Sequence, residues 1–181
     1  MELLSHRIDV SPLSLKWIFQ YICVGAVLLI LQATVGRLVA IENVQPDFLL
    51  IWIIFVALRR GQLSAVTVGS LVGLVTDLAS GEFLGVGLLA KATAGFLTGF
   101  FYRPNQIAQS LGSPWFLGIV FLVAIVHNVI FFFFYLQGTH IGFWMSFRVL
   151  GMLSAVYTTA FAAIPNIVYR RRYEEWGELS E

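Results

Sequence analysis

The sequence is poor in charged residues and has a single cysteine, and both shortages limit what the protein can be. Only 12% of its 181 residues are charged, whereas a typical soluble domain carries about 25%. Cys23 has no second cysteine with which to form a disulfide or a cysteine-cluster metal site. The net charge of +1 provides no basic surface of the size that nucleic-acid binding requires. The shortages therefore argue against a nucleic-acid-binding domain and against a disulfide-stabilised scaffold.

Hydrophobic residues make up 59% of the chain, and they form long runs separated by short polar breaks. This arrangement is typical of helices that lie side by side in a lipid bilayer. We therefore predict an all-α polytopic integral membrane protein in which residues 1–181 form one domain, a six-helix transmembrane bundle. The predicted spans are residues 17–36, 46–59, 62–79, 83–102, 114–136 and 143–169.

The second predicted span is short, because its apolar run over residues 48–58 stops at Arg59 and Arg60. A helix needs about 20 residues to cross the hydrocarbon core of a bilayer. This segment must therefore include flanking residues in the span, let its arginines reach the interface, thin the bilayer, or cross only partly.

The basic residues are distributed unevenly along the predicted topology, which has both termini on one side. Eight of the 11 lysines and arginines fall on that side. They are Arg7, Lys16, Arg59, Arg60, Arg103, Arg170, Arg171 and Arg172. Because the cytoplasmic loops of membrane proteins are enriched in lysine and arginine, we predict that both termini are cytoplasmic.

Small residues recur at every fourth position, or every eighth, on the third and fourth predicted spans. They are Ala65, Gly69 and Gly73 on the third span, and Gly87, Gly95 and Gly99 on the fourth. Small side chains leave a flat helix face on which another backbone can approach closely. Such a face either packs the two helices against each other or docks the membrane helix of a partner, and the sequence favours internal packing.

Three charged residues fall within predicted spans, where an ionisable group is costly unless it is paired or wetted. Asp77 and Lys91 lie on the small-residue faces of neighbouring spans, and Arg148 lies near the outer end of the last one. A lysine stem can reach about 6 Å along a helix. We therefore predict an intramembrane polar cluster of Asp77, Lys91 and Arg148, which is either a structural clasp or a wetted ligand site.

No catalytic, cofactor-binding or metal-binding pattern emerges from the sequence. His127 and Asn128 lie in the middle of an aromatic span, with no second histidine or carboxylate at ligand spacing. A hydrogen-bonded packing role is the favoured interpretation of this pair. Ser70 or Ser154 with His127 is a chance combination rather than a catalytic motif.

The central part of the chain, residues 46–101, carries three linked features. Pro46 precedes an apolar span that ends in a basic turn, residues 73–78 read GLVTDL, and the hairpin that follows carries Gly81 and Gly85. Together these features resemble the G-x-x-x-D-x-x-x-G-x-x-x-G core of the rod shape-determining protein MreD family. Outside residues 46–101 the likeness is one of size, span count and hydropathy.

The resemblance implies a non-enzymatic scaffold subunit, without a cofactor, in the bacterial cytoplasmic (inner) membrane. The implied fold is similar to the S-components of energy-coupling vitamin transporters. The expected partner is the transmembrane helix of MreC. Through MreC the complex would connect MreB filaments to the polymerase RodA and a class B transpeptidase, which extend peptidoglycan. Asp77, Gly81 and Gly85 are the positions that carry over from the family.

The alternative function is that of a substrate-binding S-component of a vitamin transporter. The three intramembrane charges could then line a ligand pocket near the outer surface. An S-component is expected to carry an alanine-x-x-x-alanine face on its first helix for its coupling partner. The first span offers only Gly25, Leu29 and Ala33 at that spacing, which favours the scaffold.

Overall fold

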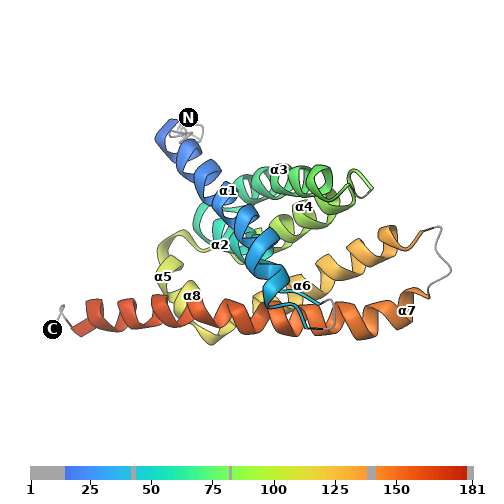
Figure 1. Ribbon diagram of the computed structural model, residues 1–181. Coiled ribbons are helices and arrows are strands. Elements are labelled where there is room, and N and C mark those ends of the chain that lie inside the picture. Colours follow the sequence, from blue (N-terminus) through green and yellow to red (C-terminus); the bar gives the residue numbers. More distant parts are fainter. Residues whose placement is uncertain (1–14, 42–43, 82, 138–141, 179–181) are drawn as a thin grey trace, which may run out of the picture.

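The computed structural model describes residues 15–41, 44–81, 83–137 and 142–178, and within these ranges the chain is helical, without a strand (Figure 1). Its helices are α1 (Leu15–Leu38), α2 (Phe48–Arg60), α3 (Gln62–Ser80), α4 (Val86–Gly99), the 3₁₀ turn η1 (Pro104–Gln106), α5 (Ile107–Gly112), α6 (Pro114–Tyr135), α7 (Phe143–Ser146), the π-helical segment η2 (Phe147–Gly151) and α8 (Met152–Glu178).

Three of these helical segments are long and apolar enough to cross a membrane. They are Gln62–Ser80, Pro114–Tyr135 and Phe143–Arg171. Two shorter apolar helices, Cys23–Leu38 and Val86–Gly99, match the first and fourth predicted spans. The helical segments therefore fall where the apolar runs predict them, and the fold is that of a helical membrane protein. The number of six crossings stays a prediction.

The short helix α2 is the centre of the bundle. It contacts α1, α3, α4, α5, α6 and α8, and Leu50, Ile53, Ile54 and Ala57 are at most 1% exposed. Its 13 residues extend about 20 Å, against about 30 Å for a hydrocarbon core. Other helices surround α2, so this helix does not need the length of a helix that crosses the hydrocarbon core by itself.

Helices α3 and α4 form a tightly packed antiparallel hairpin (Figure 1). A Cβ atom added at Gly73 would lie 2.5 Å from the carbonyl oxygen of Gly87, and one added at Gly95 would lie 2.6 Å from that of Ala65. Real Cβ atoms do not approach backbone so closely, so no larger residue fits either site. The glycine faces of the two helices are therefore occupied by each other's backbones.

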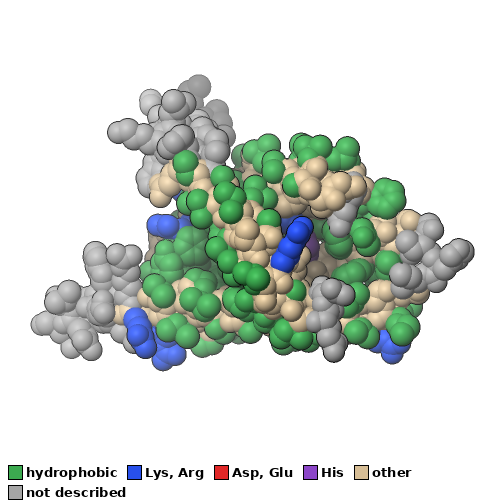
Figure 2. All heavy atoms as spheres, viewed as in Figure 1, with side chains coloured by type: hydrophobic (Ala, Val, Ile, Leu, Met, Phe, Trp, Pro, Cys, Tyr) green, Lys and Arg blue, Asp and Glu red, His purple; other side chains and the backbone are tan. Residues whose placement is uncertain are grey.

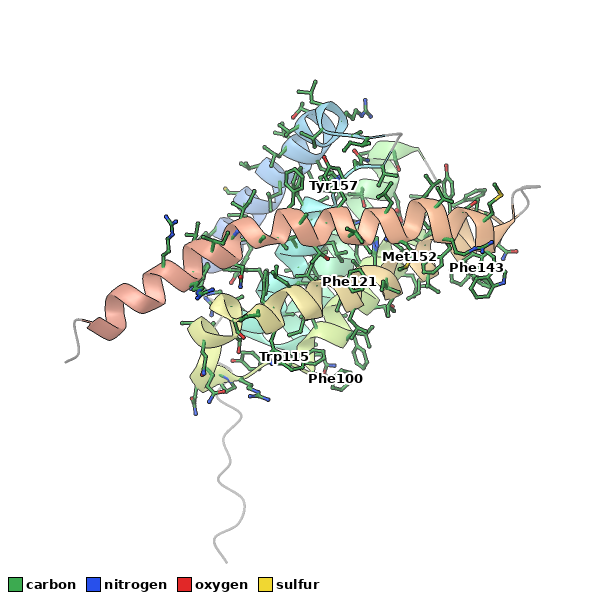
Figure 3. The ribbon with its side chains drawn as sticks, turned by 90° about the horizontal axis from the view of Figure 1, so that it is seen from below. Phe100, Trp115, Phe121, Phe143, Met152 and Tyr157 are labelled. Atoms are coloured by element: carbon green, nitrogen blue, oxygen red, sulfur yellow. The ribbon has the colours of Figure 1, made fainter. Side chains whose placement is uncertain are left out.

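The last three helical segments are continuous, and they run antiparallel to α6. Figure 3 shows α8 lying along α6, with Trp115 toward one end of the pair and Phe143 at the other. The helix is locally widened at the π segment η2. The helix passes through Pro165 and continues to Glu178, beyond residue 169, where the sequence predicts that the last span ends.

The described arginines gather mainly at one end of the bundle. The guanidinium of Arg59 lies 5.5 Å from the centre of the Phe55 ring, and that ring packs against Tyr169. Gly112 lies against the backbone of Arg170. These contacts bring together the end of α2, α5 and the end of α8. The basic residues on these elements whose side chains the structure describes are Arg59, Arg60, Arg170 and Arg171.

The packing of the hairpin generates a test with a matched control. Gly73→Ala places a methyl group against the backbone of α4, and overpacking of this kind costs about 1–3 kcal/mol. Gly118→Ala makes the same change on α6, where nothing lies within 4 Å. We expect Gly73→Ala to lower the thermal unfolding midpoint in detergent and Gly118→Ala to leave it unchanged or raise it. Equal midpoints would contradict the close approach.

Candidate functional site

The polar centre of the bundle begins at Asp47, the residue directly before α2. Its Oδ1 atom accepts a hydrogen bond of 2.8 Å from the backbone N–H of Leu50, so Asp47 is the N-cap of the helix. A carboxylate at this position also interacts favourably with the positive end of the helix dipole. The sequence places it there because Asp47 separates Pro46 from an uninterrupted apolar run.

Two further helices hold the start of α2 in place. The side chain of Gln32 on α1 accepts a hydrogen bond of 2.9 Å from the N–H of Phe48, and it donates one of 2.9 Å to the carbonyl of Pro46. The hydroxyl of Thr158 on α8 accepts a bond of 3.0 Å from the N–H of Asp47. Backbone groups that α2 cannot satisfy by itself are therefore satisfied by α1 and α8.

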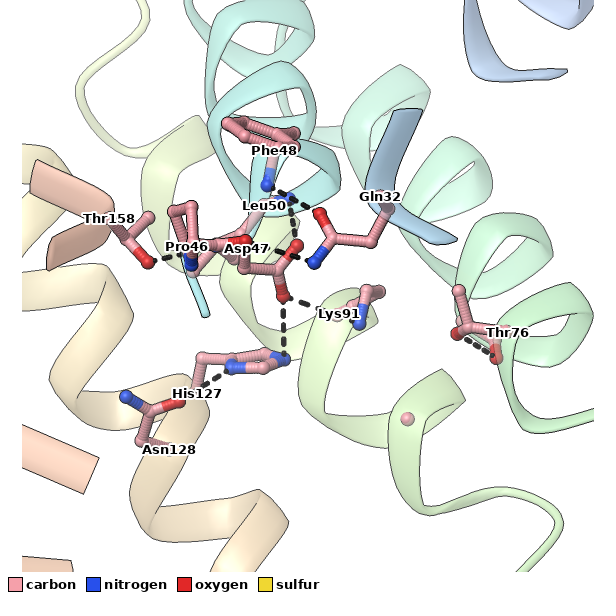
Figure 4. A network of polar contacts seen from close by, with 12 residues as sticks. Gln32, Pro46, Asp47, Phe48, Leu50, Thr76, Lys91, His127, Asn128 and Thr158 are labelled. Atoms are coloured by element: carbon pink, nitrogen blue, oxygen red, sulfur yellow. Dashed lines mark hydrogen bonds and ion pairs between the residues drawn. The ribbon is translucent and has the colours of Figure 1, made fainter. Parts of the chain in front are cut away.

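The second oxygen of Asp47 faces two basic side chains (Figure 4). Lys91 Nζ on α4 is 3.5 Å from Asp47 Oδ2, and His127 Nε2 on α6 is 4.0 Å from the same atom. The side chains of Lys91 and His127 are 9% and 6% exposed, and that of Asp47 is 20% exposed. A lysine buried to this degree needs a counter-charge, and Asp47 provides it. We call Asp47, Lys91 and His127 the central cluster.

The histidine is connected to the π segment through its neighbour. His127 Nδ1 lies 3.2 Å from Asn128 Oδ1, and Asn128 Nδ2 donates a bond of 2.7 Å to the carbonyl of Gly151. This hydrogen bond joins α6 to the last residue of the π segment.

Asp77 has a different role, at the start of α4. Its carboxylate accepts backbone N–H bonds from Gly85 at 2.8 Å, Gly87 at 3.0 Å and Leu88 at 3.2 Å. Gly85 has a φ of +100°, which directs the chain back over the carboxylate, and a Cβ atom on Gly87 would collide with Asp77 Oδ1. Asp77, only 3% exposed, is therefore the anion that closes the hairpin at a helix N-terminus.

The structure corrects the predicted cluster of Asp77, Lys91 and Arg148. Lys91 pairs with Asp47, and the carboxylate of Asp77 is occupied by backbone N–H groups. Arg148 is exposed, and its Nε donates to the carbonyl of Trp144 one turn earlier. The prediction assumed that Asp77 and Lys91 pair with each other. In the structure, backbone N–H groups at the start of α4 bind Asp77, and Asp47 at the start of α2 pairs with Lys91.

Among the predicted small-residue positions, the glycines at the turn are not packed against a neighbour, unlike those along the helices. Gly81 and Gly85 have nothing within 4 Å of an added Cβ, and both have positive φ values, +69° and +100°. Backbone conformation, rather than a packed neighbour, favours glycine there. Gly99 lies against the side chain of Gln62.

Sequence reasoning missed Asp47 as a member of a site, because Asp47 directly precedes the apolar run over residues 48–58 and is not counted among the charges within the predicted spans. The available signal was an aspartate immediately before an apolar helical run, which is an N-cap pattern. Within the described residues, no group of three or more histidine, cysteine, aspartate or glutamate side chains could hold a metal ion.

Long apolar helices, a glycine-packed hairpin and a buried ion pair at the bundle centre define a helical membrane protein. The rod shape-determining protein MreD family model matches residues 14–162. The chain belongs to this family, and its role lies in rod-shape determination. Comparison with curated proteins and with solved structures found no significant match.

The pairing of Lys91 can be tested with double-mutant cycles. Lys91→Met leaves the Asp47 carboxylate without its counter-charge, and Asp47→Asn should recover part of the lost stability. We expect a coupling energy of about 1–3 kcal/mol between these two substitutions in unfolding measurements. The matched cycle of Lys91→Met with Asp77→Asn should be additive within about 0.5 kcal/mol. Strong coupling in the second cycle and none in the first would restore the predicted Asp77–Lys91 clasp.

The capping role of Asp77 predicts a local effect. Asp77→Ala removes the acceptor of three backbone N–H groups, and loss of a helix cap costs about 0.5–2 kcal/mol. We expect faster amide hydrogen exchange at Gly85, Gly87 and Leu88, and smaller changes in the middle of α4. Ser80→Ala, which alters the same turn without touching the carboxylate, is the control. Unchanged exchange at these amides would contradict the capping role.

Proposed function

We propose that this protein is a non-enzymatic scaffold subunit of the bacterial cell-elongation complex, and that it binds the transmembrane helix of MreC. Through MreC it helps to couple MreB filaments to peptidoglycan synthesis by RodA and a class B transpeptidase. The observation that carries the proposal is the family match over residues 14–162. A chain built from short loops and closely packed helices is suited to holding a partner's helix at a fixed tilt and depth.

The packing of the bundle limits where a partner's helix can dock. The glycine faces of α3 and α4 are filled by each other, so they offer no surface to another chain. The other faces of the bundle expose large apolar side chains, including Ile30 on α1, Leu71 on α3 and Ile164 on α8, each at least 60% exposed. We therefore propose that MreC binds an outer helix face, in competition with lipid.

The proposed location is the cytoplasmic membrane, with a multi-pass topology and both termini in the cytoplasm. The gathering of Arg59, Arg60, Arg170 and Arg171 at one end of the bundle supports this orientation, because cytoplasmic segments are enriched in basic residues.

The first experiment identifies the partner and the docking face together. A photo-crosslinking amino acid is introduced at Ile30, Leu71 or Ile164, the protein is irradiated in native membranes, and the adducts are identified by mass spectrometry. We expect a MreC adduct from one of these faces and none from buried Ile53, the control position. Recovery of transport ATPase subunits, or of a vitamin in the purified protein, would overturn the proposal in favour of the transporter S-component.

A further inference from the structure

One polar atom of the central cluster has no hydrogen-bond partner in the described structure. His127 Nε2 is buried, and the whole residue is only 5% exposed. Asp47 Oδ2 lies 4.0 Å from this nitrogen, which is too long for a hydrogen bond. Buried polar groups are nearly always paired with protein or water, so this atom calls for a partner.

The neighbouring hydrogen bonds determine which ring nitrogen carries the proton. Asn128 Nδ2 donates to the carbonyl of Gly151, and this fixes the orientation of the amide. Asn128 Oδ1 therefore faces His127 Nδ1, and because an amide oxygen only accepts, Nδ1 must donate. In a neutral imidazole Nε2 is then the acceptor. A lone pair thus points toward the Asp47 carboxylate, which is also an acceptor.

The missing group must therefore donate a hydrogen bond to Nε2. Lys91 is the nearby donor, but its ammonium lies 3.5 Å from the Asp47 carboxylate, and no hydrogen bond joins it to the ring in the described residues. An ammonium has three donors, and Asp47 does not use them all. The central cluster thus presents an unpaired acceptor and spare donors around the same carboxylate.

The charge balance of the cluster limits the ligand. Asp47 and Lys91 cancel each other, so a proton on both ring nitrogens of His127 would leave this cluster with an uncompensated positive charge, which is costly at a buried site. The ring is therefore neutral. A bound anion would face the carboxylate and the Nε2 lone pair, and a bound cation would face the ammonium. The ligand must therefore be uncharged, and it must donate a hydrogen bond to Nε2. A hydroxyl group meets both requirements, because it donates one hydrogen bond and accepts others without carrying a charge.

We propose that the central cluster is a binding site for one uncharged hydroxyl group, which donates to His127 Nε2 and accepts from Lys91. The group belongs either to a water molecule or to a hydroxyl-bearing molecule such as a lipid headgroup. The site is within reach of the surface, because the side chain of Asp47 is 20% exposed. Figure 2 shows one face of the molecule, on which hydrophobic side chains predominate and basic side chains are few.

The test reads the ring nitrogens directly. The variant with His6→Gln and His140→Gln, which leaves His127 as its only histidine, is labelled with ¹⁵N-histidine, reconstituted into bilayers and studied by solid-state NMR. We expect a protonated Nδ1, a non-protonated Nε2, and magnetisation transfer to Nε2 from a hydroxyl proton. In phosphatidylcholine vesicles, whose headgroup has no hydroxyl, a transfer that D₂O abolishes identifies water. A transfer found only in phosphatidylglycerol vesicles identifies a lipid hydroxyl.

Two results would overturn the proposal. A protonated Nε2 would mean that the ring donates directly to Asp47, and a non-protonated Nε2 without any transfer in either lipid would mean that the atom is dry. The variant Asn128→Leu tests the tautomer separately, because it removes the acceptor that holds the proton on Nδ1. We expect part of the Nε2 signal to become protonated in that variant, with loss of the transfer. An unchanged spectrum would contradict the derived tautomer.

Discussion

The fold depends on how the first turn of α2 is held inside the bundle. A helix start exposes backbone N–H groups that must find partners, and the hydrocarbon core of a bilayer has no bulk water to provide them. Here the partners are the carboxylate of Asp47, the amide of Gln32 and the hydroxyl of Thr158. The same carboxylate then neutralises Lys91. One acidic residue therefore connects α2 and α4, while the adjoining backbone bonds bring in α1 and α8.

This arrangement explains why a short helix can occupy the centre. Helix α2 is too short to span a bilayer of ordinary thickness, and a polar cluster at its N-terminus would be costly in lipid. Helices α1, α3, α4, α6 and α8 contact α2. The short helix and the polar cluster at its start are therefore enclosed by protein. Glycine permits the close approach of α3 and α4, in which Gly69 lies against the backbone of Lys91. The side chain of Lys91 extends to Asp47.

The sequence predicts the helices better than it predicts their partners. Apolar runs and the polar breaks between them indicate the helices directly, and glycines spaced four residues apart indicate flat faces such as that of Gly69 and Gly73. The partner of Lys91 could not be derived in this way. It depends on how α4 is rotated against α2, and that rotation is set by packing among residues far apart in the sequence. Asp47 lies at the edge of its apolar run, and its role appears only when other helices enclose the start of α2.

The sequence distances within the bundle have a consequence for its assembly during synthesis. Asp77 closes the α3–α4 hairpin through amides 8 to 11 residues away, so this unit can form as soon as its two helices are in the membrane. The bond from Asp47 to Thr158 spans 111 residues, and the bond from Tyr157 to Val39 spans 118. Both must wait until α8 has left the ribosome. Until then the start of α2 lacks part of its support, and a nascent chain that stalls before α8 exposes that polar start to the insertion and quality-control machinery.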